Sequence, residues 1–335
     1  MYNRIELRYV DYGGVLSESM PYVHMGDIVP YNETKDHSDI LLVFGGSSNH
    51  IVTALSGILS FVYHFPYSPL LFVDFGATKE EVCWLKYVFT MVHQYHDAMS
   101  MSIPIYYRIY DWEHFPDWMH ITKALNHGGY TWKPIAIADA FFQWKGVIMW
   151  NDAGNYYGNG CHGGIQLMRK EGVYMPYDPT NYTRFHNDSY TFLLDNGLIK
   201  SFNRTYVRSG RAIYMLFDYR NDVCRERLMI PWVQCAFTRK CMTLKGVWKN
   251  KHLPEQGVLS ALMHHNNITL SCDPILDFNP IRWRDNYKDS SVIPNRFLQG
   301  EMETYSARIG RNYSQELLQQ LCVNEEHQNN STNSP

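Results

Sequence analysis

A short apolar run that ends in an aspartate constrains the fold of this chain most. Residues 146–150 read Gly-Val-Ile-Met-Trp, which is too short for a helix and typical of a buried strand. Asp152 follows within Asn-Asp-Ala-Gly, and a carboxylate at the carboxyl end of a strand lies where open α/β sheets bind ligands. Such a carboxylate can hold a divalent cation, which in turn can hold a diphosphate. From this run alone a simple turn at Asp152 is equally compatible, since Asn, Asp and Gly favour turns.

The segments before this run alternate between strands and helices, which predicts an α/β fold with a mainly parallel sheet. Residues 40–44 are a continuous apolar run, as expected for a strand buried on both faces. Residues 70–73 are expected to form a second buried strand, and residues 103–107 a third strand. Asn49 is the expected N-cap of a helix that reaches about Tyr63. Residues 78–81 read Thr-Lys-Glu-Glu, a capping box for the next helix, and a third helix is expected over about 134–144.

The chain divides into three expected parts. Residues 1–37 are polar and aperiodic and are expected to form an N-terminal extension packed on the domain. Residues 38–322 are expected to form a single domain, and residues 323–335 a polar, disordered tail. The glycine-rich stretch 154–164 after the aspartate predicts a flexible loop, which either takes part in recognition or is a solvated connector.

The charge balance and the chain start bear on partners and compartment. With 30 Lys and Arg against 33 Asp and Glu, and a net charge of -3, the chain lacks the basic footprint of a nucleic-acid-binding protein. The first residues lack the apolar segment of a signal peptide. The apolar stretch 55–75 contains two prolines and is not expected to span a membrane.

Glycosylation sequons nevertheless indicate a secretory protein. Eight Asn-X-Ser/Thr sites occur, at Asn32, Asn181, Asn187, Asn203, Asn267, Asn312, Asn329 and Asn330. Composition predicts only about 2–3 by chance. We therefore expect a protein of the Golgi or another secretory-pathway lumen, with contact to a membrane only through a type II anchor that is missing from this chain. An Asn-rich protein with meaningless sequons is the alternative.

Seven cysteines fit an oxidising compartment. They form no Cys-X-X-Cys pair, which makes a zinc ribbon unexpected. In an oxidising lumen six can pair, leaving one free.

Three further motifs carry polar chemistry. Residues 44–50, Phe-Gly-Gly-Ser-Ser-Asn-His, are expected to form a strand end, a loop of small residues and a helix start, which favours anions. Lys133 in Tyr-Thr-Trp-Lys-Pro can reach a phosphate as a point charge. Glu255 follows Pro254 in the first turn of a helix. Taken singly, each also suits a structural role: an ordinary turn, a solvated lysine and a helix cap.

Together these motifs resemble the GT-A glycosyltransferase-like families of eukaryotic secretory proteins, including poorly characterised nucleotide-diphospho-sugar transferase domains. The matching patterns are "S-S-N-H" at 47–50, "Y-x-W-K-P" at 130–134, "W-[LM]-D-A" at 150–153, "[DE]-Q-x-x-L-S" at 255–260 and "P-W-x-x-C-A…C" at 231–241. Their order and spacing match over residues 38 to about 275. The resemblance implies a single GT-A-like α/β domain whose mainly parallel central sheet is flanked by helices.

The resemblance also implies a function, transfer of a sugar from a nucleotide-sugar to a hydroxyl of a glycan, glycoprotein or glycolipid acceptor. It places Asp152 on Mn²⁺ or Mg²⁺ and makes Glu255 the general base of an inverting reaction; a retaining reaction needs no such base. The residues expected to bind the nucleotide-sugar are Ser47, Asn49, Trp132 and Lys133. Cys235 and Cys241 are expected to form a disulfide, because a tight loop can span the five residues between them.

Departures from the family pattern leave two other functions open. The D-x-D metal motif is reduced to Asp152-Ala153-Gly154, and Glu255 stands where the family usually has Asp. A catalytically silent GT-A-like domain that binds carbohydrate or a protein is therefore the first alternative. A Rossmann-like methyltransferase, with a cofactor loop at 44–47 and Asp74 as the ribose acid, is the second; the sequons and the Glu-Gln motif count against it.

Overall fold

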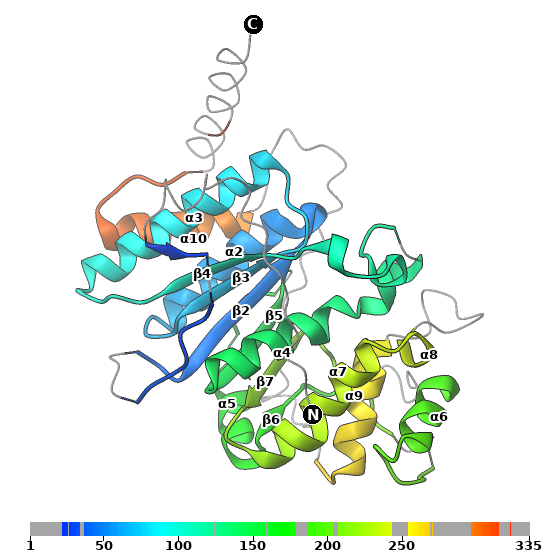
Figure 1. Cartoon of the computed structure of the whole chain (residues 1–335). Coiled ribbons are helices and arrows are strands. Elements are labelled where there is room, and N and C mark those ends of the chain that lie inside the picture. The colour runs from blue at the N-terminus through cyan, green and yellow to red at the C-terminus, as the bar shows by residue number, and fades with distance from the viewer. Residues whose placement is uncertain are drawn as a thin grey trace, which may run out of the picture.

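A seven-stranded sheet organises the fold in the computed structural model of the chain (Figure 1). The structure describes residues 22–25, 27–33, 37–123, 125–153, 155–158, 160–178, 186–203, 207–242, 254–268, 270, 296–314 and 322. In sheet order, the strands are β1 (Val23–His24), β4 (Ile105–Ile109), β3 (Leu70–Asp74), β2 (Ile40–Gly46), β5 (Val147–Asp152), β7 (Tyr214–Asp218) and β6 (Val173–Tyr174). The first five are parallel, and β7 runs antiparallel to both β5 and β6. The expected α/β class with a mainly parallel sheet is confirmed.

Helices cover both faces of this sheet. One face packs against α2 (Ile51–His64), α3 (Lys79–Ala98), α5 (Gly160–Glu171) and α10 (Arg296–Ile309). The other packs against α4 (Trp132–Trp144), α7 (Ile230–Ala236) and α9 (Pro254–His265), with α6 (Asn187–Asp195) and α8 (Arg239–Met242) beside them. Short helical turns are η1 (Ser48–His50), η2 (Trp112–His114), η3 (Asp117–Met119) and η4 (Leu125–Tyr130), and η6 (Val223–Met229) is a π-helical segment. No described helix is long and apolar enough to cross a membrane.

Strand β2 lies at the centre of the sheet and explains why the strands read as unbroken apolar runs. Leu42 and Phe44 enter the core on one face, and Leu41 and Val43 enter the core on the other. Its register aligns Gly45 with Asp152 of β5 and Gly46 with Asp74 of β3. The carboxyl ends of three parallel strands therefore meet at one edge.

The sequence predicts the start of α3 correctly but not the start of α2. The capping box is confirmed: Glu81 N donates to Thr78 Oγ1 at 3.2 Å, and Thr78 N donates to Glu81 Oε2 at 2.7 Å. The N-cap expected at Asn49 is wrong. Residues 48–50 form the turn η1, closed by a 2.7 Å bond from His50 N to Ser47 O, so α2 begins at Ile51 with His50 as its N-cap.

The glycine-rich stretch is only partly the loop that its composition suggests, since residues 155–158 lie outside helices and strands but its second half is helical. Residues 160–171 form α5, which ends the loop after β5 within a few residues. Cys161 is fully buried, and Gly164 lies against the Tyr174 ring, where an added Cβ would come within 2.9 Å. The glycine therefore permits close packing of helix on strand, which composition alone does not distinguish from flexibility.

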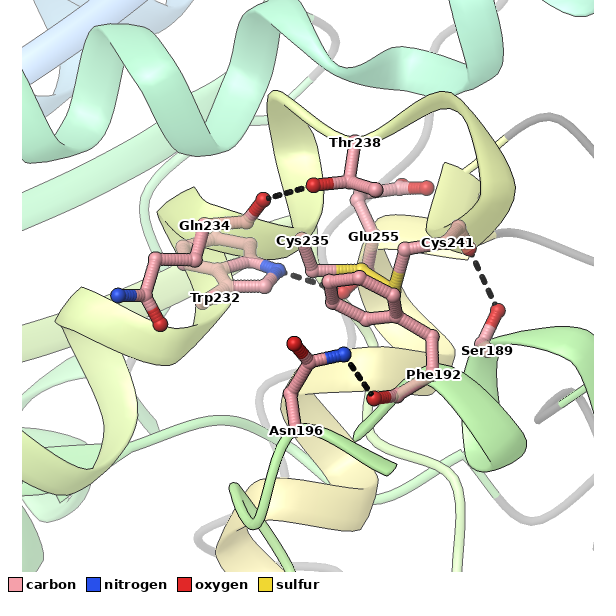
Figure 2. The surroundings of a disulfide bond; sticks show 9 residues. All are labelled: Ser189, Phe192, Asn196, Trp232, Gln234, Cys235, Thr238, Cys241 and Glu255. Atoms are coloured by element: carbon pink, nitrogen blue, oxygen red, sulfur yellow. Dashed lines mark hydrogen bonds between the residues drawn. A yellow bond between two sulfur atoms is a disulfide. The ribbon is translucent and has the colours of Figure 1, made fainter. Parts of the chain in front are cut away.

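Two disulfides form among the described residues. The expected Cys235–Cys241 bond is confirmed; it links α7 to α8 with the Cα atoms 5.3 Å apart (Figure 2). Cys83 of α3 pairs with Cys322, Cα to Cα 5.7 Å. The pairing of six cysteines is wrong, because Cys161 and Cys224 are free, buried thiols in core clusters on opposite faces of the sheet. Cys272 lies outside the described residues.

Sequon exposure gives a first prediction. Five sequon asparagines in the described part are exposed: Asn32, Asn187, Asn203, Asn267 and Asn312. The Asn187 site differs, because its Ser189 is fully buried and donates to Cys241 O at 2.6 Å (Figure 2). In a secretory host we expect glycosidase treatment to lower the mass of the chain, and peptide mapping to show Asn267 modified and Asn187 bare.

Variants separate the two sites. Asn267→Gln should remove one glycan, whereas Asn187→Gln should leave the mass of the glycan fraction unchanged. A secreted chain without any glycan would contradict the lumenal expectation. The remaining sequons, at 181, 329 and 330, lie outside the described residues.

Candidate functional site

Asp152 closes β5 at the edge where the strand ends meet. Its Oδ1 lies 2.8 Å from Lys133 Nζ and accepts a 2.8 Å hydrogen bond from Trp150 Nε1; its Oδ2 accepts from Lys133 Nζ at 3.1 Å. The side chain is 30% exposed. Its backbone carbonyl accepts from Asn155 N at 2.9 Å, so the residue both ends the strand and begins a turn. The turn expected at Asp152 is therefore present, and ligand binding by its carboxylate stays a prediction.

Lys133 is buried, which excludes the solvated lysine of the sequence analysis. It lies in the first turn of α4, its side chain is only 5% exposed, and its Nζ also donates to Ala212 O at 3.0 Å. The ammonium lies 5.7 Å from the centre of the Trp132 ring. A buried charge is costly unless it is paired and hydrogen-bonded, and here Asp152 and Ala212 meet both needs.

Glu255 is buried in the first turn of α9, with 2% of its surface exposed, so it is not a solvent-facing cap. Burial raises the pKa of its carboxyl group to about 7; the Lys133 charge lowers the pKa, the backbone N–H groups of residues 255 and 256 lower it, and the Asp152 charge raises it. Among the described residues, its Oε2 has no hydrogen-bond partner. The three predicted charged residues therefore share one electrostatic environment.

The segment around Ala212 ties the lysine to α9. Ala212 N lies 3.4 Å from Gln256 Oε1, and Gln256 Nε2 donates to Ser209 Oγ at 3.2 Å. Trp232 Nε1 donates to Glu255 O at 2.8 Å beside the Cys235–Cys241 bond (Figure 2). Sequence reasoning missed Ala212, because a backbone carbonyl carries no side-chain signal.

Three further residues expected to bind the nucleotide lie near the same edge. Ser47 directly follows β2, two residues beyond the Gly45 that pairs with Asp152. Trp132 packs against Phe75, with ring centres 4.5 Å apart, and its indole N–H has no partner in the part of the chain that the structure describes. Asn49 lies in the turn η1. Among these side chains, the Trp132 ring lies beside the Lys133 ammonium.

Asp74 is fully engaged, which counts against the methyltransferase alternative. Its Oδ1 accepts from Gly76 N and Ala77 N, both at 2.7 Å, and its Oδ2 accepts from Tyr107 OH at 2.6 Å. The residue is 3% exposed. A carboxylate that must hold a ribose hydroxyl needs an accessible oxygen, and Asp74 holds the loop after β3 instead.

The donor set at Asp152 does not fit a divalent cation. Hard cations need several oxygen ligands, and the only carboxylate of the reduced motif already bonds Lys133 and Trp150 through its two oxygens. Within the described residues, no group of three or more His, Cys, Asp or Glu side chains could hold a metal ion. The expected metal role of Asp152 therefore finds no supporting ligands there.

Comparison with known proteins finds similarity only among solved structures. No protein-family model and no curated protein matches the sequence. Core-mannan synthase A from Aspergillus fumigatus, in a Mn/GDP form, is 12% identical with a TM-score of 0.41, and the match covers 75% of this chain and 74% of that one. Mouse xyloside xylosyltransferase 1 is 9% identical with a TM-score of 0.40, covering 69% and 84%.

A bifunctional glycosyltransferase, WbbM, is 14% identical with a TM-score of 0.37; the match covers 64% of this chain but only 39% of that protein. All three are glycosyltransferases, the class whose motifs the sequence resembles. Overlaps of this extent assign no activity, substrate or residue role to this chain.

Proposed function

We propose that this chain is a glycosyltransferase that moves a sugar from a nucleotide-sugar to an acceptor hydroxyl. The observation that carries the proposal is the ion pair of buried Lys133 with partly exposed Asp152, whose charges both act on buried Glu255, at the carboxyl edge of the sheet. Removing charged groups from water costs free energy, and ionisable side chains with shifted pKa values are concentrated at functional sites. The ordered motifs of the sequence support the same class of reaction.

In this reaction the negative charge on the departing nucleoside diphosphate must be stabilised. The first turn of α4 carries Lys133, and the positive end of that helix points toward the same edge as its ammonium. The small-residue loop from Ser47 leads to the start of α2, where backbone N–H groups also favour an anion. Ser47, Asn49 and Trp132 are proposed to hold the nucleoside and sugar beside it.

Glu255 is proposed as the general base of an inverting reaction. Its carboxylate takes the proton of the acceptor hydroxyl while the acceptor oxygen bonds to the anomeric carbon and the bond to the diphosphate breaks. A carboxyl pKa of about 7 matches the proton affinity of such a base to neutral pH. Because only 2% of the residue is exposed, the acceptor must displace neighbouring chain to reach it.

The setting proposed for this activity is the Golgi or another secretory-pathway lumen, with a glycan, glycoprotein or glycolipid as acceptor. Two disulfides and five exposed sequon asparagines support it. A type II membrane anchor outside this sequence belongs to the same proposal.

A screen of the purified chain against nucleotide-sugars tests the function. We expect calorimetry to detect binding of at least one donor, and mass spectrometry to detect either transfer to a glycan or slow donor hydrolysis. The second candidate is the catalytically silent domain, which the lack of a second carboxylate at Gly154 favours. Such a domain should bind no nucleotide-sugar, and that result would overturn the enzyme proposal.

A further inference from the structure

We propose that the Lys133 ammonium takes the place of the divalent cation at this site, so that the chain carries its own cation. This inference rests on the proposed function for its ligand, a nucleoside diphosphate group. Its structural part, which ion Asp152 holds, can be tested without any nucleotide.

The first observation in support of this proposal is that both oxygens of the Asp152 carboxylate already have partners. Lys133 Nζ lies 2.8 Å and 3.1 Å from its two oxygens, and the Trp150 indole donates to Oδ1 as well. A divalent ion bound to either oxygen would lie close to the ammonium. Repulsion between the two positive charges is strong where little water screens it.

The second observation in support of the proposal is that the Lys133 side chain is held in place. Its Nζ is bonded to Ala212 O at 3.0 Å, and its side chain is 5% exposed. To make room for a metal, the ammonium must leave both partners, and the Ala212 carbonyl must find another donor. A lysine held by two partner groups is a fixed part of the site.

Charge balance is the third support. A motif with two carboxylates and a divalent ion is neutral overall, and one carboxylate with one ammonium is neutral too. Here Gly154 stands where a D-x-D motif has its second carboxylate, so this site has one negative charge fewer. The singly charged ammonium of Lys133 in place of a doubly charged metal ion removes one positive charge, and the site stays neutral. An ammonium has three N–H donors, and one can turn to a phosphate oxygen while Asp152 and Ala212 keep the others.

Manganese titration followed by electron paramagnetic resonance tests which ion the site holds. The full chain is expected to leave added Mn²⁺ in the free form. Lys133→Ala removes the internal cation and exposes Asp152 and the Ala212 carbonyl, so its Mn²⁺ affinity should rise at least about tenfold. The double variant Lys133→Ala/Asp152→Asn should lose that gain. Lys170→Ala, at a lysine that is 77% exposed and pairs with Glu171, is the matched control and should behave as the unaltered chain.

Calorimetry with UDP and GDP tests the consequence. The unaltered chain should bind its preferred nucleotide equally well in EDTA and in Mn²⁺. Lys133→Ala should lose binding in EDTA and regain part of it in Mn²⁺.

The outcomes separate the two proposals. Stoichiometric Mn²⁺ binding by the unaltered chain, or nucleotide binding that EDTA abolishes, overturns the inference, and both measurements stand even if a Lys133 variant does not fold. A gain of Mn²⁺ binding in Lys133→Ala, with no nucleotide bound by any form of the chain, supports the inference and overturns the proposed function.

Discussion

Asp152→Asn is expected to lower sugar transfer by roughly 10²–10³-fold or more, the usual effect of removing one preorganised electrostatic contact. The amide keeps the shape of the side chain but loses the charge that holds the Lys133 ammonium in place. A donor-transfer assay at saturating nucleotide-sugar measures the loss. Full activity in this variant would reduce Asp152 to a turn residue.

The same substitution should also destabilise the fold, which the sequence does not predict. A residue at a strand end is expected to change the melting temperature little, but here the change leaves a buried lysine without its partner. Breaking a buried pair costs about 3–5 kcal/mol. Asp152 is 30% exposed and Glu255 can ionise to compensate, so we expect a loss of roughly 1–2 kcal/mol.

A surface pair provides the control for the stability measurement. Asp117 is 89% exposed and lies 3.9 Å from Lys123. Asp117→Asn should leave the melting temperature and sugar transfer unchanged. A loss as large as that of Asp152→Asn would show that the effect does not come from burial of the partner.

The strands of the fold are predictable because their signal is local. Residues 40–44 are apolar without alternation, since both sides of β2 are covered, and that pattern needs no knowledge of the partner strands. The start of α2 and the helix α5 are not predictable in this way. Gly164 is required by the Tyr174 ring that lies across from it, and that contact appears only in the folded chain.

The site shows the same division. Asp152, Lys133 and Glu255 are recognisable from motifs, but their burial is not. Lys133 is separated by 79 residues from the carbonyl that binds it, and that carbonyl belongs to Ala212, whose side chain signals nothing. The sequence thus indicates which groups carry charge, while tertiary packing determines which of them neutralise one another.

Glu255→Gln is expected to separate nucleotide binding from chemistry. If Glu255 is the base, the variant keeps its donor affinity and loses turnover by roughly 10²–10⁴-fold. In the unaltered chain, activity should rise with pH and level off above the carboxyl pKa of about 7, because only the ionised carboxylate accepts a proton. Unchanged turnover in the variant would exclude the base and the inverting mechanism with it.

Stability should respond to pH in the opposite sense, which ties the pKa to the folded site. The pKa of Glu255 is about 7 in the fold against an ordinary value of 4.5, so the folded chain binds this proton more tightly than the unfolded chain. The stabilisation is fully present below pH 4.5 and is lost as pH rises to 7, a change of roughly 2–3 kcal/mol.

Glu255→Gln has no such proton to lose. The melting temperature of this variant, measured relative to that of the unaltered chain, should therefore be higher at pH 8 than at pH 5. Glu226→Gln, at an exposed glutamate paired with Arg225, should show no such difference. If Glu255→Gln also shows no such difference, folding does not raise the pKa of the Glu255 carboxyl group. The rise of activity with pH must then come from another group.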